Sequence, residues 1–194
     1  MDSVELLAHP VRLRVVHALS GGQAQTIAQL CARLPDTSKA TVYRHVETLT
    51  TAGILEIASE QRVRGAVERR YRLRRERAVI DADAAAAATP EDHRAIFATA
   101  MVALLAEFDT YLDRENADPT ADLVGYRQHA VWLSAGEVAD LIDDLRAVIV
   151  PRLRNSPTAD RAQYLLSPIL FPVAGPLDTE PAPEASSART TDHC

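Results

Sequence analysis

Apolar residues follow helical spacing in several stretches of the chain, and one short stretch is the most informative. Val42, Val46 and Leu49 recur at intervals of four and three residues, which predicts one narrow buried stripe on a helix. Ser38 is a typical N-cap residue, and Gly53 is typical of the position just past a helix C-terminus. The pattern therefore predicts a short helix that packs through a single face.

The other faces of this predicted helix are rich in hydrogen-bond donors, two of which are fixed cations. A short helix with donors near its N-terminus suits insertion into the major groove of DNA. Arg44 matches the paired acceptors of guanine best, whereas His45 is ambiguous because it borders the buried stripe. An ordinary amphipathic surface helix is the alternative. The candidate DNA contacts are Ser38, Lys39, Thr41, Tyr43, Arg44 and His45.

An arginine-rich hairpin is predicted directly after this helix. Residues 54–59 and 67–73 resemble two strands, and Gly65 can adopt the positive φ that a tight turn needs. So many cations in a short span suit a wing that lies along a phosphate backbone. The arginines in this span are Arg62, Arg64, Arg69, Arg70, Arg72, Arg74, Arg75 and Arg77, and the first four are the candidate phosphate contacts.

Two further helices are predicted upstream. Pro10 suits the first turn of a helix over residues 11–19. Thr26 and Gln29 have the spacing of a capping box that opens the next helix. Helix, turn, recognition helix and two-stranded wing together predict a winged helix-turn-helix over residues 1–78.

Three segments of this predicted domain resemble a known family. Residues 8–16, AHPVRLRVV, look like the opening helix of ArsR-type transcription regulators. Residues 40–45 and 52–55 resemble the recognition helix and first wing strand of that family. Residues 62–73 resemble the wing of a subgroup with an added C-terminal domain. The resemblance covers about residues 3–75 and implies a DNA-binding regulator that acts as a repressor.

Charge is distributed unevenly along the chain. Residues 1–78 contain 13 Lys and Arg against 8 Asp and Glu, whereas residues 79–194 contain 8 against 19. The two parts therefore carry net charges of +5 and −11, which add to the chain's −6. A basic N-terminal part and an acidic remainder fit a DNA-binding domain joined to an assembly or sensing region.

A long helix is predicted from Thr89 to about Asn116. Its apolar residues recur at intervals of four and three, which is typical of a helix–helix seam. The seam either closes over the winged domain of its own chain or pairs with the same helix of a second chain, and we favour a homodimer. The seam residues are Phe97, Met101, Leu104, Phe108 and Tyr111.

The remaining residues are predicted to form a small α/β unit, so the expected fold class is mainly α with small β elements. The expected elements are a strand at 126–133, a helix from Ser134 to about Pro151 and a strand within 162–173. The predicted domains are a winged domain at 1–78, a linker at 79–88, a dimerisation and possible effector-binding region at 89–174, and a disordered tail at 175–194.

Signals for small-molecule chemistry are weaker. A small apolar effector could contact Tyr126, Trp132, Tyr164 and Phe171, although these residues would serve equally well as core. Many ArsR-type regulators sense metals, but the His and Cys residues here lack ligand spacing, so neither metal nor cofactor is expected. No catalytic motif is evident, which argues against an enzyme. A winged domain that binds protein instead of DNA is the alternative function.

The expected location is the cytoplasm, and no membrane partner is expected. The first residues lack the pattern of a secretory signal, and no uncharged apolar stretch reaches the ~18 residues of a membrane span. The two cysteines, Cys31 and Cys194, are too few for a disulfide framework.

Overall fold

The computed structural model describes residues 6, 8–63, 65–78 and 86–175. By compactness the chain divides into residues 1–163 and 164–194, and residues 164–175 contain neither helix nor strand. The elements in chain order are α2 (Pro10–Leu19), β1 (Gln25–Thr26), α3 (Ile27–Arg33), α4 (Lys39–Thr51), β2 (Leu55–Val63), β3 (Ala66–Leu73), the 3-10 turn η1 (Arg75–Arg77), α6 (Pro90–Leu112) and α7 (Ala135–Leu153).

Helices α2, α3 and α4 enclose one apolar core. The predicted stripe of α4 supplies Val42, Val46 and Leu49, each at most 1% exposed. Leu19 of α2 and Leu30 of α3 are equally inaccessible and belong to the same cluster. Because only one face of α4 is needed for this core, its opposite face is left to solvent.

The helix ends lie where the sequence predicts them. The Ser38 hydroxyl accepts a hydrogen bond from the backbone N–H of Thr41, which caps α4. Thr26 and Gln29 form the reciprocal capping box at the start of α3. Gly53 has φ +75° just past α4, a conformation in which a side chain would be strained.

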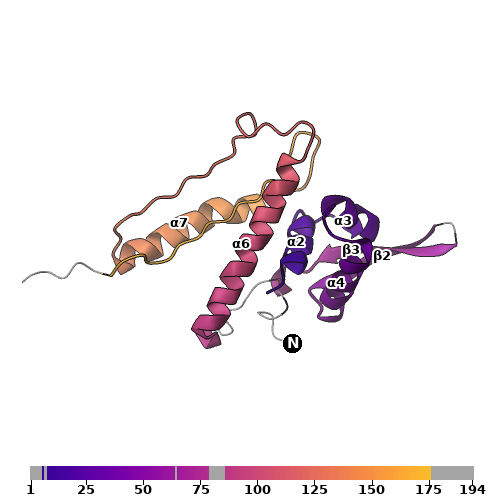
Figure 1. Cartoon of the computed structure of the whole chain (residues 1–194), viewed down its shortest axis with the longest axis horizontal. Helices are drawn as coiled ribbons and strands as arrows, with labels where there is room; N and C mark the ends of the chain where they lie inside the picture. Colours follow the sequence, from indigo (N-terminus) through magenta and orange to yellow (C-terminus); the bar gives the residue numbers. More distant parts are fainter. Residues whose placement is uncertain (1–5, 7, 64, 79–85, 176–194) are drawn as a thin grey trace, which may run out of the picture. The chain divides into compact units, whose positions relative to one another are not determined.

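The wing is a hairpin within a three-stranded antiparallel sheet of order β1-β3-β2. Leu55 pairs with Leu73 at its base, and a bulge lies between Ile57 and Ser59. Figure 1 shows β2 and β3 projecting away from the three helices. The winged helix-turn-helix predicted from the sequence is therefore confirmed.

Helix α6 begins with the predicted cap at Thr89, ends at Leu112 and lies beside α2 (Figure 1). Within the described residues it is one helix that is long and apolar enough to cross a membrane, by length and composition alone. A single helix of this kind is weak support for a membrane span, because helix–helix contacts select the same composition.

Two strands predicted after α6 are absent, although the mainly helical class is confirmed. Residues 125–133 and 161–173 are extended, exposed and outside any ladder. A strand needs a neighbour for its backbone N–H and C=O groups, and no described segment pairs with either stretch. Pro168 and Pro172 further restrict pairing in the second.

Helix α7 begins with the predicted capping box of Ser134 and Glu137. It ends at Leu153, two residues later than Pro151, which lies inside its last turn. Residues 79–85 of the predicted linker and 176–194 of the predicted tail lie outside the described residues. The predicted domain boundaries stay predictions.

Candidate nucleic-acid interface

The solvent face of α4 presents two cations and a phenol. Lys39, Tyr43 and Arg44 are all exposed, and Tyr43 retains 51% of its accessible surface. Among the described residues, neither Lys39 nor Arg44 takes part in an ion pair. Both charges are therefore available to an anionic ligand.

Ser38 and Thr41 define the start of this face. Their hydroxyl oxygens lie 2.9 Å apart, and one of the two hydroxyls donates to the other. Since a pair of hydroxyls has two hydrogens and this contact uses one, the second hydrogen is left for an acceptor such as a phosphate oxygen. The two residues both fix the helix start and offer a polar contact.

His45 differs from the other predicted DNA contacts of α4 because it is buried, so its role as a DNA contact stays a prediction. Its side chain is only 6% exposed, and its ring lies 4.2 Å from that of His9, centroid to centroid. The same His9 caps α2 by accepting from the backbone N–H of Val11. Burial, with the nearby charges of His9, Arg44 and Arg12, lowers the pKa of His45 from 6.5 to about 4. His45 therefore joins α4 to the start of α2 as a neutral ring.

The wing arginines fall into two groups. Arg69 pairs with Glu60 at 2.8 Å, and Arg70 donates to the backbone carbonyl of Ala24 at 3.3 Å. Arg62 makes no ion pair with any described residue, and Arg64 lies outside the described residues. Of the three predicted phosphate contacts that the structure describes, Arg62 has the most available charge, because Arg69 is ion-paired and Arg70 is hydrogen-bonded.

Glu56 neutralises much of the remaining wing charge. Its carboxylate accepts from Arg72 at 2.5 Å and from Arg74 at 2.9 Å. The hydrogen bonds from these two arginines hold the pKa of Glu56 below its usual value. A count of arginines alone therefore overstates the positive charge that the wing offers to DNA.

Glu47 is an exposed residue of α4 that the sequence reasoning left out. It lies four residues after Tyr43 and three after Arg44, on the same helix face. Burial raises the pKa of Tyr71, the buried tyrosine at the base of the wing. The nearby Tyr43 and Glu47 raise it further. A helical projection of the exposed residues, rather than a search for donors, would have found it.

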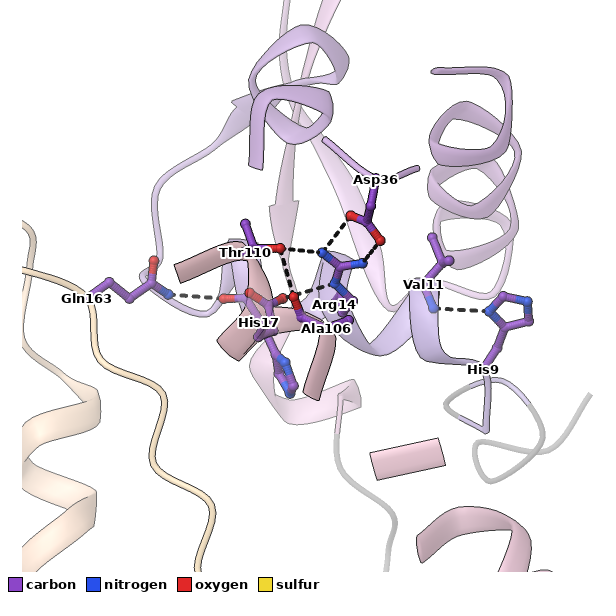
Figure 2. A network of polar contacts seen from close by, with 9 residues as sticks. His9, Val11, Arg14, His17, Asp36, Ala106, Thr110 and Gln163 are labelled. Atoms are coloured by element: carbon purple, nitrogen blue, oxygen red, sulfur yellow. Dashed lines mark hydrogen bonds and ion pairs between the residues drawn. The ribbon is translucent and has the colours of Figure 1, made fainter. Parts of the chain in front are cut away.

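A buried arginine connects the turn before α4 to α6. Arg14 of α2 is 2% exposed and binds Asp36, in the turn before α4, through two hydrogen bonds of 2.6 and 2.9 Å. It also donates to the Thr110 hydroxyl at 3.2 Å, and its Nε lies 3.5 Å from Glu107. Figure 2 shows Arg14 between Asp36 and Thr110.

The two carboxylates around Arg14 respond in opposite directions. The short hydrogen bonds from Arg14 lower the pKa of Asp36. Burial raises the pKa of Glu107, which is farther from the guanidinium and only partly offset by it. Asp36 is therefore the main counter-ion of Arg14.

The predicted seam of α6 and its contact with α2 use different faces. Ala103 is fully buried, and Glu107 and Thr110 follow at helical spacing beside Arg14. Phe97 and Met101 lie roughly 120° to 160° around the helix from Ala103, at 3.6 residues per turn. The contact with α2 therefore does not use these two seam residues.

The far end of the seam contacts the segment after α6. The Phe108 ring stacks on Tyr111 and meets Tyr126 edge-on, each at 5.9 Å between centroids. The Tyr111 hydroxyl donates to Asp122 at 2.7 Å. Leu104 and Met101 are half-buried, whereas Phe97 is exposed.

The four predicted effector residues are all exposed. These four residues line neither the pocket beside Gln29 and Arg70 nor the groove beside Arg44 and Glu47. An effector site there stays a prediction. Among the described residues, no three His, Cys, Asp or Glu side chains gather in a way that could hold a metal ion.

Comparison with known proteins assigns the N-terminal elements. Residues 7–58 match the model of a family described as a helix-turn-helix domain, a range that includes α2, α3 and α4. No curated protein matches the chain. With the exposed cations of α4 and the adjacent wing, this match identifies a DNA-binding helix-turn-helix domain of the general kind found in transcription regulators.

Proposed function

We propose that this protein is a homodimeric transcription repressor of the ArsR-like winged type, located in the cytoplasm, that binds a specific operator sequence. Helix α4 enters the major groove, and the β2–β3 wing follows the phosphate backbone. The observation that carries the proposal is the exposed face of α4. It presents Lys39 and Arg44 without ion pairs among the described residues, beside a wing on which Arg62 is also unpaired.

Arg44 is the proposed base-reading residue. Its planar guanidinium can donate to O6 and N7 of guanine together, a pattern that phosphate contacts cannot replace. Lys39, in the first turn of α4, reaches a base or a phosphate. Ser38, Thr41 and Tyr43 orient the helix on the backbone.

The seam of α6 is the proposed contact with a second copy. Phe97 and Met101 of this seam point away from the face that packs on α2, and Phe97 is 47% exposed. A twofold dimer buries the same apolar patch from both chains and presents two recognition helices to a palindromic operator. Apolar residues beyond α6, such as Trp132 at 70% exposure, enlarge the surface that a partner would cover.

The first experiment separates DNA binding from protein binding. The full chain is titrated against a random duplex at about 50 and 200 mM salt, where several phosphate contacts change affinity by orders of magnitude. We expect binding at low salt that weakens steeply at high salt, and a Lys39→Glu, Arg44→Glu double variant that no longer binds. A wild-type protein that binds no duplex at low salt would favour a protein-interaction module.

A further inference from the structure

Glu47 lies at the centre of the DNA-facing surface of α4. It is exposed, one turn after Tyr43 and one turn before Thr51, and it borders the same surface groove as Arg44. No described residue forms an ion pair with it, and Arg69 of the nearby wing is already bound to Glu60. Glu47 therefore has no partner among the described residues that would explain its place on this face.

A carboxylate at this place opposes DNA binding unless it meets a hydrogen-bond donor. Phosphate oxygens only accept hydrogen bonds and carry the same sign of charge, so contact with the backbone is unfavourable. In the major groove, donors come from exocyclic amino groups, and carboxylates pair with N4 of cytosine. Guanine and thymine present acceptors at the corresponding edge, which would leave the carboxylate repelled, and adenine places its N7 acceptor beside its N6 donor.

The spacing of Arg44 and Glu47 supports neighbouring contacts with two base pairs. Three residues of helix rise about 4.5 Å, which is close to the roughly 3.4 Å between successive bases of one strand. We propose that Glu47 is a specificity-determining residue that selects cytosine in the base pair next to the guanine read by Arg44. This inference rests on the proposed function of α4 as the recognition helix.

The role follows from combining a donor and an acceptor on one face. Arg44 favours bases with acceptors, and Glu47 favours the amino group of cytosine, which has no acceptor beside it, over the other bases. Its charge also weakens binding to sequences that do not satisfy it. Glu47 thus lowers affinity for most DNA and raises the ratio between operator and random sequence.

The test is selection of bound sequences from a pool of randomised duplexes, with the full chain at one fixed salt concentration. The variants are Glu47→Ala, Glu47→Gln and Arg44→Ala. Glu68→Ala is the matched control, because Glu68 is an exposed glutamate of β3 for which no ion pair is found among the described residues. Affinity for a fixed random duplex is measured alongside.

We expect the wild-type motif to contain a cytosine that Glu47→Ala no longer selects, with discrimination there reduced by roughly tenfold and other positions unchanged. Glu47→Gln should prefer adenine at that position, because an amide matches the N6 and N7 edge of adenine. Glu68→Ala should leave the motif intact.

A Glu47→Ala motif identical to that of the wild type would overturn the inference, whatever its overall affinity. If Arg44→Ala still altered the motif in that case, the proposed function would stand without a reading role for Glu47. A wild-type protein that selects no motif would overturn the proposed function and this inference together.

Discussion

Arg14 donates two hydrogen bonds to Asp36 and so fixes the turn that precedes α4. Asp36 lies two residues before Ser38, the N-cap of α4. The same guanidinium contacts Glu107 and Thr110 of α6. One buried side chain therefore joins the turn before α4 to α6. A shift of α6 relative to α2 would have to break these contacts or move Arg14.

Removing Arg14 should destabilise the fold strongly. Arg14→Ala leaves the Asp36 and Glu107 carboxylates without their cation, which costs about 3 kcal/mol of unfolding free energy. Urea unfolding measures the loss. Arg146→Ala, which breaks an exposed 3.4 Å pair with Asp143, is the control and should cost less than about 0.5 kcal/mol. Equal losses of unfolding free energy in the two variants would show that the contacts of Arg14 do not stabilise the fold.

Stability should fall between neutral pH and about pH 4 because of His45. The pKa of His45 is about 4 in the folded chain and 6.5 in the unfolded one, so only the unfolded chain binds a proton in this interval. Unfolding free energy should therefore decrease as pH falls from about 6.5 to 4, by up to about 3 kcal/mol from this group.

His45→Leu is the matched variant for this pH dependence. The pKa values of His9 and His17 are also lowered, chiefly by burial, so part of the pH dependence should remain in the variant. Urea midpoints at pH 7.5 and 5 compare the two proteins. The same loss of stability in both would mean that His45 does not resist protonation.

The seam of α6 should control the oligomeric state. Phe97→Glu with Met101→Glu places two charges on the seam but outside the contact with α2, so the protein should become monomeric and stay folded. Val102→Glu is the control, because Val102 is 53% exposed and lies roughly 140° around the helix from Phe97. Sedimentation equilibrium gives the mass of each variant. A dimer that survives the double change would place the interface elsewhere.

The wing should contribute phosphate contacts through Arg62, which forms no ion pair with any described residue. Arg62→Ala is expected to weaken binding to all sequences alike and to reduce the slope of log affinity against log salt by about one. Arg72→Ala should change the slope less, because Glu56 already neutralises that guanidinium. Salt titrations with one random duplex compare the two variants. Equal slopes for Arg62→Ala and Arg72→Ala would show that the ion pair with Glu56 does not weaken the phosphate contact of Arg72.

Local patterns predicted the helix-turn-helix accurately because its signals act within a few residues. The stripe of Val42 and Val46, the cap at Ser38 and the positive φ of Gly53 all depend on near neighbours. The hairpin was predicted for the same reason, since strand and turn residues follow one another directly.

Features that depend on distant residues were not predicted. The burial of Arg14 needs Asp36 from one turn and Glu107 from another helix, which no local spacing reveals. The sequence leaves His45 ambiguous, because the contact between its ring and that of His9, far upstream, is not visible in local spacing. Residues 126–133 have the composition of a strand, but no described segment pairs with them. Composition alone does not show whether a pairing partner exists.

The central claim is that α4 reads base sequence through Arg44. The direct measurement is a titration of the wild type and Arg44→Ala against the selected operator and a scrambled duplex at one salt concentration. We expect a loss of roughly 1 to 3 kcal/mol on the operator and a much smaller loss on the scrambled duplex, so the specificity ratio falls. Equal losses on both duplexes would make Arg44 a phosphate contact rather than a base-reading residue.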